Sequence, residues 1–232
     1  MDRLVGVPEL LDGPLDDRAA LVGNLRDLAR INRITGGAAL SVRAVEDLRA
    51  LGQVGRVLDV GTGAGDIPVA LVRAARRSGR GIRITAIDSR PEVLAAAVVA
   101  RPGLEAIAEI QLEVADGRAL PYPDAAFDVA HASLVLHHLE PAEAIQFLRE
   151  LRRVATVGVV VNDLVRSRIN WFGGWLLVHA IATSRFTRHD GPLSVRRAYT
   201  RRELDDLVQR AGLETVAVHA GFADHRIAIA AR

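Results

Sequence analysis

From residue 56 onward, short runs rich in β-branched residues alternate with longer amphipathic segments. The runs predict five strands, at residues 56–60, 82–88, 110–115, 127–132 and 157–162. Helices are expected between them, and two begin at or near prolines, Pro91 and Pro141, a residue suited to a first helical turn. Two further runs, at 215–220 and 226–230, lie close together and predict an antiparallel hairpin at the sheet edge. The pattern therefore predicts a doubly wound α/β fold with a mostly parallel, seven-stranded sheet.

Two regions lie outside this alternation. Residues 1–50 precede the first strand and carry leucine and isoleucine at three- and four-residue steps, which indicates a helix. We expect this region to form an N-terminal helical lid over the main domain, residues 51–232. Residues 164–199 contain both tryptophans and are expected to form a cap inserted into that domain.

Composition and charge narrow the class of protein. The 232-residue chain has no cysteine, which excludes structural disulfides and thiolate metal sites. All of its basic side chains are arginine and the formal net charge is only +2, so its high isoelectric point does not indicate a nucleic-acid-binding surface. The N-terminus lacks signal-peptide features, and the most apolar stretch, 169–183, is shorter than the roughly 20 residues of a membrane span. We expect a cytoplasmic protein without a membrane span or a nucleic-acid partner.

A glycine-rich turn, GTGAG at residues 61–65, follows the first predicted strand. Such turns join a strand to a helix and bring bare backbone close to a nucleotide ligand. Asp88 ends the second strand, where a carboxylate can accept hydrogen bonds from ribose hydroxyls. Asp116 and Gly117 end the third, where an acid and an amide can contact adenine. Each signal alone is weak, because Asp59 and Asp116 are also turn-capping residues and nicotinamide enzymes use a similar turn. Together they predict a nucleotide-like cofactor.

These segments resemble the class I, seven-stranded S-adenosylmethionine-dependent methyltransferases, in particular those of ubiquinone and menaquinone biosynthesis. The resemblance rests on LDVGTGAGDIP, AIDSRPEVL and VADGRALPYPDAAFDVAHASLVLHHL, and it covers about residues 55–160. It implies that S-adenosylmethionine is the cofactor and that residues 51–232 form its binding domain. The cofactor-binding residues that it implies are Asp59, Gly61, Thr62, Gly63, Asp88, Ser89, Asp116, Gly117 and Ser133. Arg33, in the lid, is a further candidate for the methionine carboxylate, with a surface role as the alternative.

Three histidines are candidate catalytic bases, since histidine is the usual base near neutral pH. His137 and His138 follow the fourth strand at the rim where open α/β sheets bind ligands, although both could simply pack there. His189 lies beside Asp190 in a segment expected to be a loop, 185–192. No metal is expected, because the fourth strand ends without the acid that metal-dependent catechol-type methyltransferases place there.

A looser resemblance, carried by NDLVRSR at 162–168 and the later Arg-His-Asp-Gly segment, is to bacterial methyltransferases of secondary metabolism. It implies a small apolar, aromatic or polyketide-like acceptor and favours O-methylation. Trp171 and Trp175, one helical turn apart, are either core residues or part of the acceptor pocket. The alternatives are an NAD(P)-dependent oxidoreductase, an RNA or protein methyltransferase, and a catalytically silent binding protein. The oligomeric state stays open, with a homodimer among the options.

Overall fold

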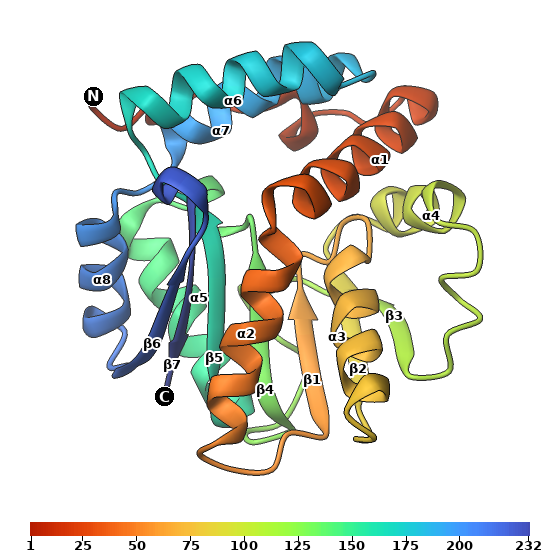
Figure 1. Ribbon diagram of the computed structural model, residues 1–232, viewed down its shortest axis with the longest axis vertical. Helices are drawn as coiled ribbons and strands as arrows, with labels where there is room; N and C mark the ends of the chain where they lie inside the picture. The colour runs from red at the N-terminus through yellow and green to blue at the C-terminus, as the bar shows by residue number, and fades with distance from the viewer.

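A seven-stranded sheet forms the centre of the computed structural model, which describes all 232 residues (Figure 1). The strands lie in the order β3-β2-β1-β4-β5-β7-β6. Their bounds are β1 Arg56–Val60, β2 Arg83–Asp88, β3 Ile110–Val114, β4 Phe127–Ser133, β5 Ala155–Leu164, β6 Thr215–Ala220 and β7 Arg226–Ala231. All seven expected strands are confirmed, with ends that differ from the prediction by one or two residues at most.

The first five strands run parallel, and the last strand enters the sheet in the opposite direction. β7 pairs antiparallel with β5 on one side and with β6 on the other. The closing hairpin therefore joins the sheet through its second strand, which is buried along its whole length and leaves β6 at the edge. The predicted doubly wound, mostly parallel fold and its antiparallel hairpin are both confirmed.

Eight α-helices surround the sheet. They are α1 Arg18–Thr35, α2 Gly37–Arg49, α3 Asp66–Arg77, α4 Pro91–Ala100, α5 Pro141–Val154, α6 Arg168–Ile181, α7 Arg185–Arg197 and α8 Arg201–Arg210, with short 3-10 segments η1 Leu10–Asp12, η2 Leu136–His138 and η3 Phe222–Asp224. Successive strand residues point to opposite faces. Val57 of β1 therefore packs in the core that α2, α3 and α4 cover, and Leu58 packs in the core formed with α5 and α8.

Helices α1, α6 and α7 form a layer over the carboxyl ends of the parallel strands (Figure 1). α7 packs against both α1 and α6. Gly36, with a φ of 79°, ends α1 in the left-handed conformation and turns the chain down to α2. Because α2 packs against β5, β6 and β7, the part of residues 1–50 that lies above the strands ends with α1. None of the helices has the length and apolar character needed to cross a membrane.

One cap segment differs from its sequence-based expectation. Glycine and proline at 191 and 192 predict a loop, but Arg185–Arg197 forms helix α7 with Pro192 inside it. The Ser184 hydroxyl caps the helix by accepting a hydrogen bond from the Phe186 amide at 3.3 Å. Proline removes one backbone donor from a helix. The helix nevertheless forms because its apolar side, including Phe186 and Val195, is buried against neighbouring helices.

Candidate active site

The turn after β1 requires glycine at several positions. Gly61, Gly63 and Gly65 have φ angles of 70°, 49° and 64°, a region that only glycine adopts freely. A Cβ atom on Gly61 would also lie 2.6 Å from Cγ2 of Val135. The Thr62 amide donates to the Ile87 carbonyl oxygen at 2.8 Å, which fixes the turn to the end of β2. The turn leads directly into α3, whose N-terminal amides can face a ligand.

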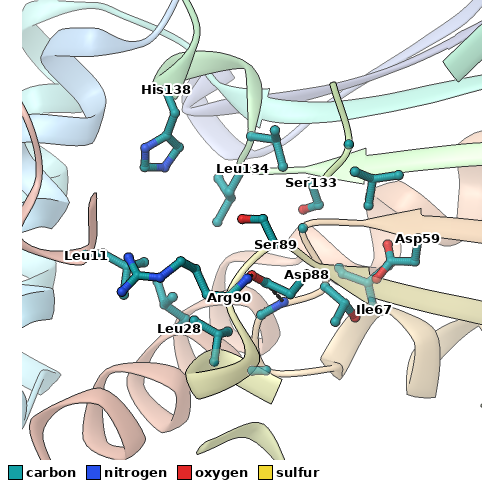
Figure 2. A pocket seen from close by; sticks show the side chains of 18 of the residues that line it. Leu11, Leu28, Asp59, Ile67, Asp88, Ser89, Arg90, Ser133, Leu134 and His138 are labelled. Atoms are coloured by element: carbon teal, nitrogen blue, oxygen red, sulfur yellow. Dashed lines mark hydrogen bonds between the residues drawn. The ribbon is translucent and has the colours of Figure 1, made fainter. Parts of the chain in front are cut away.

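A cavity of about 410 Å³ opens at the carboxyl ends of β1 to β4. It is lined by nine of the ten predicted cofactor-binding residues: Asp59, Gly61, Thr62, Gly63, Asp88, Ser89, Asp116, Gly117 and Ser133. Figure 2 shows Asp59 and His138 toward opposite sides of this cavity, with Ser89 and Leu134 between them in that view. The tenth predicted residue, Arg33, is exposed on α1 and does not line the cavity, whereas its neighbour Asn32 does.

Two buried polar atoms in this cavity have no hydrogen-bond partner in the chain. Asp59 uses Oδ1 to bond His131 Nδ1 at 2.6 Å, while its Oδ2 is buried and unpaired. Thr62 Oγ1 is also buried and unpaired. A buried acceptor without a partner is costly, so both atoms fit a ligand that brings hydrogen-bond donors, such as the ammonium group of a methionine moiety.

Asp88 is already positioned by two backbone amides. Its Oδ2 accepts from Gly63 at 3.2 Å, and its Oδ1 accepts from Arg90 at 3.1 Å. Burial raises the pKa of Asp88, although both amides act to lower it. Each carboxylate oxygen retains a second lone pair, so the side chain can also accept hydrogen bonds from two ribose hydroxyls.

Asp116 is held differently, because it lies in an exposed position beside Arg118. The Arg118 guanidinium donates to the Asp116 carboxylate, with NH2 at 2.9 Å from Oδ2, and lowers the pKa of Asp116. Gly117, next in the chain, has almost no room for a side chain, since a Cβ there would meet Val60 and lie 2.9 Å from Cε2 of Phe147. The end of β3 thus offers a flat backbone surface beside an ionised carboxylate.

The sheet order, the glycine turn and the strand-end acids around one cavity are those of a class I S-adenosylmethionine-dependent methyltransferase domain, and the cavity fits S-adenosylmethionine as the cofactor. In agreement, residues 57–158 match the family model described as "Methyltransferase domain". The predicted class, fold and cofactor are confirmed. The alternative of a nicotinamide-dependent oxidoreductase is not supported.

Individual relatives share parts of the chain. A 105-residue segment is 31% identical to ajmaline N-methyltransferase of Rauvolfia serpentina, covering 45% of this chain and 34% of that protein. A 72-residue segment is 38% identical to a ubiquinone/menaquinone biosynthesis C-methyltransferase of Rickettsia akari (strain Hartford), covering 31% of this chain and 29% of that protein. The chain thus spans about a third of the length of these curated relatives.

The fold is shared with solved structures at low sequence identity. Human N-acetylserotonin methyltransferase, solved in complex with S-adenosylmethionine, superposes with a TM-score of 0.66 and 17% identity. The match covers 98% of this chain and 60% of that chain. At this identity the likeness establishes the fold and leaves the acceptor undefined.

A second cavity, of about 590 Å³ and mostly apolar, adjoins the first under the cap helices. Residues that line both cavities mark the boundary between them: Leu11, Leu28, Asn32, Leu134 and His138. Helix α6 contributes Gly173, Gly174 and Leu177 to the second cavity. Trp171 and Trp175 are 36% and 40% exposed and do not line it, so they are neither core residues nor pocket residues in this structure.

The three candidate histidines occupy different environments. His137 is buried, lines the second cavity, and has its Nδ1 2.7 Å from Oδ1 of Asp163. His138 lines both cavities, and its Nδ1 lies 3.0 Å from Oδ1 of Asp12. His189 is exposed and lines neither cavity; its Nδ1 is 2.7 Å from Oδ1 of Asp190. The structure therefore brings His137 and His138 to the site and leaves His189 outside it.

Glu9 and Arg226 line the second cavity although the sequence pattern did not indicate them. Glu9 comes from the N-terminal segment, and burial raises its pKa to about 7. Arg226 begins β7 and is buried; its Nε donates to Asn162 Oδ1 at 2.5 Å, and its NH2 donates to Ser133 Oγ at 2.5 Å. A single arginine opening an otherwise apolar strand was the one signal available for Arg226. No local signal marks Glu9, because its place depends on how the N-terminus crosses the cap.

Proposed function

We propose that this protein transfers the methyl group of S-adenosylmethionine to an oxygen atom of a small, mostly apolar, aromatic acceptor. The observation that carries the proposal is the pair of adjoining cavities. One cavity contains the strand-end acids and the glycine turn, and the other is larger and mostly apolar. A volume of about 590 Å³ is in the range of pockets that enclose a small molecule, which favours this acceptor over RNA or protein.

The polar end of the second cavity supports oxygen as the methylated atom. Asp163 holds Nδ1 of His137, so that Nε2 is free to accept a proton from an acceptor hydroxyl. Burial acts to raise the pKa of Asp163, but the charge and hydrogen bond of His137 outweigh it and lower that pKa. An ionised Asp163 stabilises the imidazolium that forms when His137 takes the proton. The bound cofactor supplies the electrophilic methyl group. The chain positions the acceptor beside that group, excludes water from the site and provides the base.

Cofactor binding is tested first, by thermal unfolding with S-adenosylhomocysteine or NADPH. A ligand at about 100 times its Kd adds about 2.7 kcal/mol, which corresponds to about 5–10 °C for a chain of this size. We expect that shift with S-adenosylhomocysteine alone. A larger shift with NADPH would overturn the cofactor assignment.

The acceptor class is tested with methyl-labelled S-adenosylmethionine and three matched aromatic series that carry a hydroxyl, an amino group or neither. We expect labelled product from the hydroxyl series, and His137→Gln to lower kcat by about 10²–10⁴. His189→Gln serves as the control, because His189 is exposed and outside both cavities. Label found in nitrogen- or carbon-methylated products, or only in RNA or protein, would refute this acceptor.

A further inference from the structure

We propose that Glu9, His137 and His138 form a binding site for a divalent first-row transition-metal ion at the boundary of the two cavities. From the sequence, no metal is expected, because the fourth strand ends without an acid. The site proposed here does not use the ends of the strands. It combines the N-terminal segment with the 3-10 turn after β4, two regions that meet only in the folded chain.

Three metal-ligating groups converge at this point. Glu9 Oε1 lies 3.8 Å from His137 Nε2, and Glu9 Oε2 lies 3.9 Å from His138 Nε2. All three ligand atoms lie within 4.8 Å of one another. Atoms that share an ion at about 2.0–2.2 Å each are separated by about 3–4 Å, so small side-chain adjustments suffice.

Both histidines are oriented as metal ligands usually are. Their Nδ1 atoms are each held by a carboxylate, Asp163 for His137 at 2.7 Å and Asp12 for His138 at 3.0 Å. This leaves both Nε2 atoms facing Glu9, and neither makes a hydrogen bond within the chain. Carboxylates behind the ligating imidazoles are a common feature of metal sites, where they fix ring orientation and strengthen the ligand.

Burial and charge distinguish this cluster from a solvated group of acids. His137 is 2% exposed and Glu9 is 5% exposed, and both line the second cavity instead of lying on the outer surface. Glu9, Asp12 and Asp163 bring three carboxylates around two imidazoles. Arg226 acts on Asp163, and Arg197 is the cation beside Glu9, 2.7 Å from Asp12 Oδ2 but 3.8 Å from Glu9 Oε1. A divalent ion would supply the missing positive charge beside Glu9.

The donor set limits the ion and suggests its role. Two imidazoles and one carboxylate suit zinc, iron(II), manganese(II) or nickel(II) and disfavour calcium and magnesium, which prefer oxygen ligands. Coordination positions opposite the three ligands would open into the cavity. This part rests on the proposed function: an acceptor hydroxyl bound there would have its pKa lowered by the ion. With the ion bound, His137 Nε2 is a ligand and the ion activates the acceptor hydroxyl in its place; in the metal-free protein His137 keeps the role of base.

The test uses the tag-free 232-residue chain, stripped with EDTA and titrated with Zn²⁺ by calorimetry. Bound metal is counted after desalting. We expect one Zn²⁺ per chain and at least tenfold weaker binding in Glu9→Gln. Asp12→Asn keeps all three proposed ligands and removes the carboxylate behind His138, so Zn²⁺ is expected to bind about 10–100-fold more weakly. His179→Gln is the matched control, since His179 is an exposed histidine on α6.

S-adenosylhomocysteine binding to the same Glu9→Gln protein separates loss of the metal site from misfolding, because Glu9 does not line the cofactor cavity. Retained cofactor affinity with lost Zn²⁺ affinity supports the site. Substoichiometric Zn²⁺ binding, or equal Zn²⁺ affinity in wild type, Glu9→Gln and Asp12→Asn, overturns it. Neither result depends on methyl transfer, so the metal site and the proposed reaction can fail separately.

Discussion

Replacing Asp88 by asparagine tests the cofactor site with little change in side-chain volume. In the wild type, both carboxylate oxygens accept a backbone amide, one from Gly63 and one from Arg90. An asparagine has one acceptor oxygen, and its NH₂ group would have to face one of those two amide donors. The substitution therefore removes charge, disturbs one internal hydrogen bond, and leaves a ribose hydroxyl without an acceptor.

The expected loss follows from these contacts. A hydrogen bond to a charged group contributes about 1.5–3 kcal/mol. Weakening the two bonds from the ribose hydroxyls to Asp88 should therefore cost about 3 kcal/mol of binding free energy. At 1.36 kcal/mol per factor of ten, the Kd for S-adenosylhomocysteine should rise roughly 100-fold. The Tm of the unliganded protein should change little, because the disturbed amide hydrogen bond is offset by the removal of a buried charge. Burial raises the pKa of Asp88, so its ionised form lowers the free energy of unfolding at neutral pH.

Calorimetric titration with S-adenosylhomocysteine measures this loss, with Asp206→Asn on the exposed face of α8 as the matched control. The wild type should also bind more weakly as the pH falls through the raised pKa of Asp88, because the protonated carboxyl loses acceptor capacity. The Asp88→Asn variant should lack this component. A Kd within about threefold of the wild type would refute the reasoning, since it would mean that Asp88 does not contact the ligand.

Three further substitutions test packing around the site. Gly117→Ala should destabilise the fold by about 1–3 kcal/mol and weaken cofactor binding, because the added Cβ would lie 2.9 Å from Phe147 Cε2; unchanged urea midpoint and Kd would contradict this. Gly174→Leu should fill part of the second cavity and raise the KM for the acceptor at least tenfold, with no change in S-adenosylhomocysteine affinity. Gly174→Ala should be tolerated, because its Cβ would make only ordinary van der Waals contacts. Arg226→Met should lower the free energy of unfolding by about 2–4 kcal/mol, since it leaves buried amide oxygens without a donor; urea unfolding within 1 kcal/mol of wild type would exclude that role.

The residues around the first cavity could be predicted because most of them follow neighbouring strands of one parallel sheet. In a parallel sheet the carboxyl ends of successive strands meet at one edge. Asp88 and Asp116, each following a recognisable strand, must therefore come close to the glycine turn after β1, whatever the loops do. The structure brings them to one cavity for this reason. The family resemblance added the chemical identity of the cofactor, which strand positions by themselves do not supply.

The placement of Arg33 shows how one residue of helical register changes a prediction. Leu21, Leu25 and Leu28 form the buried or boundary face of α1, and continuing that face by four residues leads to Asn32. Each residue in a helix turns by about 100°, so Arg33 points away from the cavity. The spacing of the leucines therefore indicates Asn32 as the residue that faces the cavity. Arg33 was predicted instead because a cation can pair with the methionine carboxylate.

The lining of the second cavity could not be predicted because its residues come from segments far apart in the sequence. Glu9 lies 3.8 Å from His137 Nε2 only because η1 packs against α7, and α7 is a helix that local signals assign to a loop. Contacts of this kind depend on tertiary packing, which overrides local propensity. Sequence reasoning therefore pointed to two histidines that line the second cavity, His137 and His138, and missed Glu9, which faces them.

Asn32 explains how the two sides are held in register. Its Nδ2 donates to Asp66 Oδ2 at 2.9 Å, and its Oδ1 accepts from Arg226 NH1 at 2.5 Å. One amide thus joins the start of α3, beside the glycine turn, to the start of β7, beneath the second cavity. Because Asn32 also lines both cavities, the carboxyl-terminal end of α1 is fixed to the sheet by groups of opposite charge. The N-terminal segment is attached mainly to α7, where Asp190 accepts from the Leu10 and Leu11 amides, and it reaches the site through Asp12, whose Oδ1 lies 3.0 Å from His138 Nδ1. The packing of this segment on α7 is therefore what brings Glu9 and Asp12 beside the site histidines.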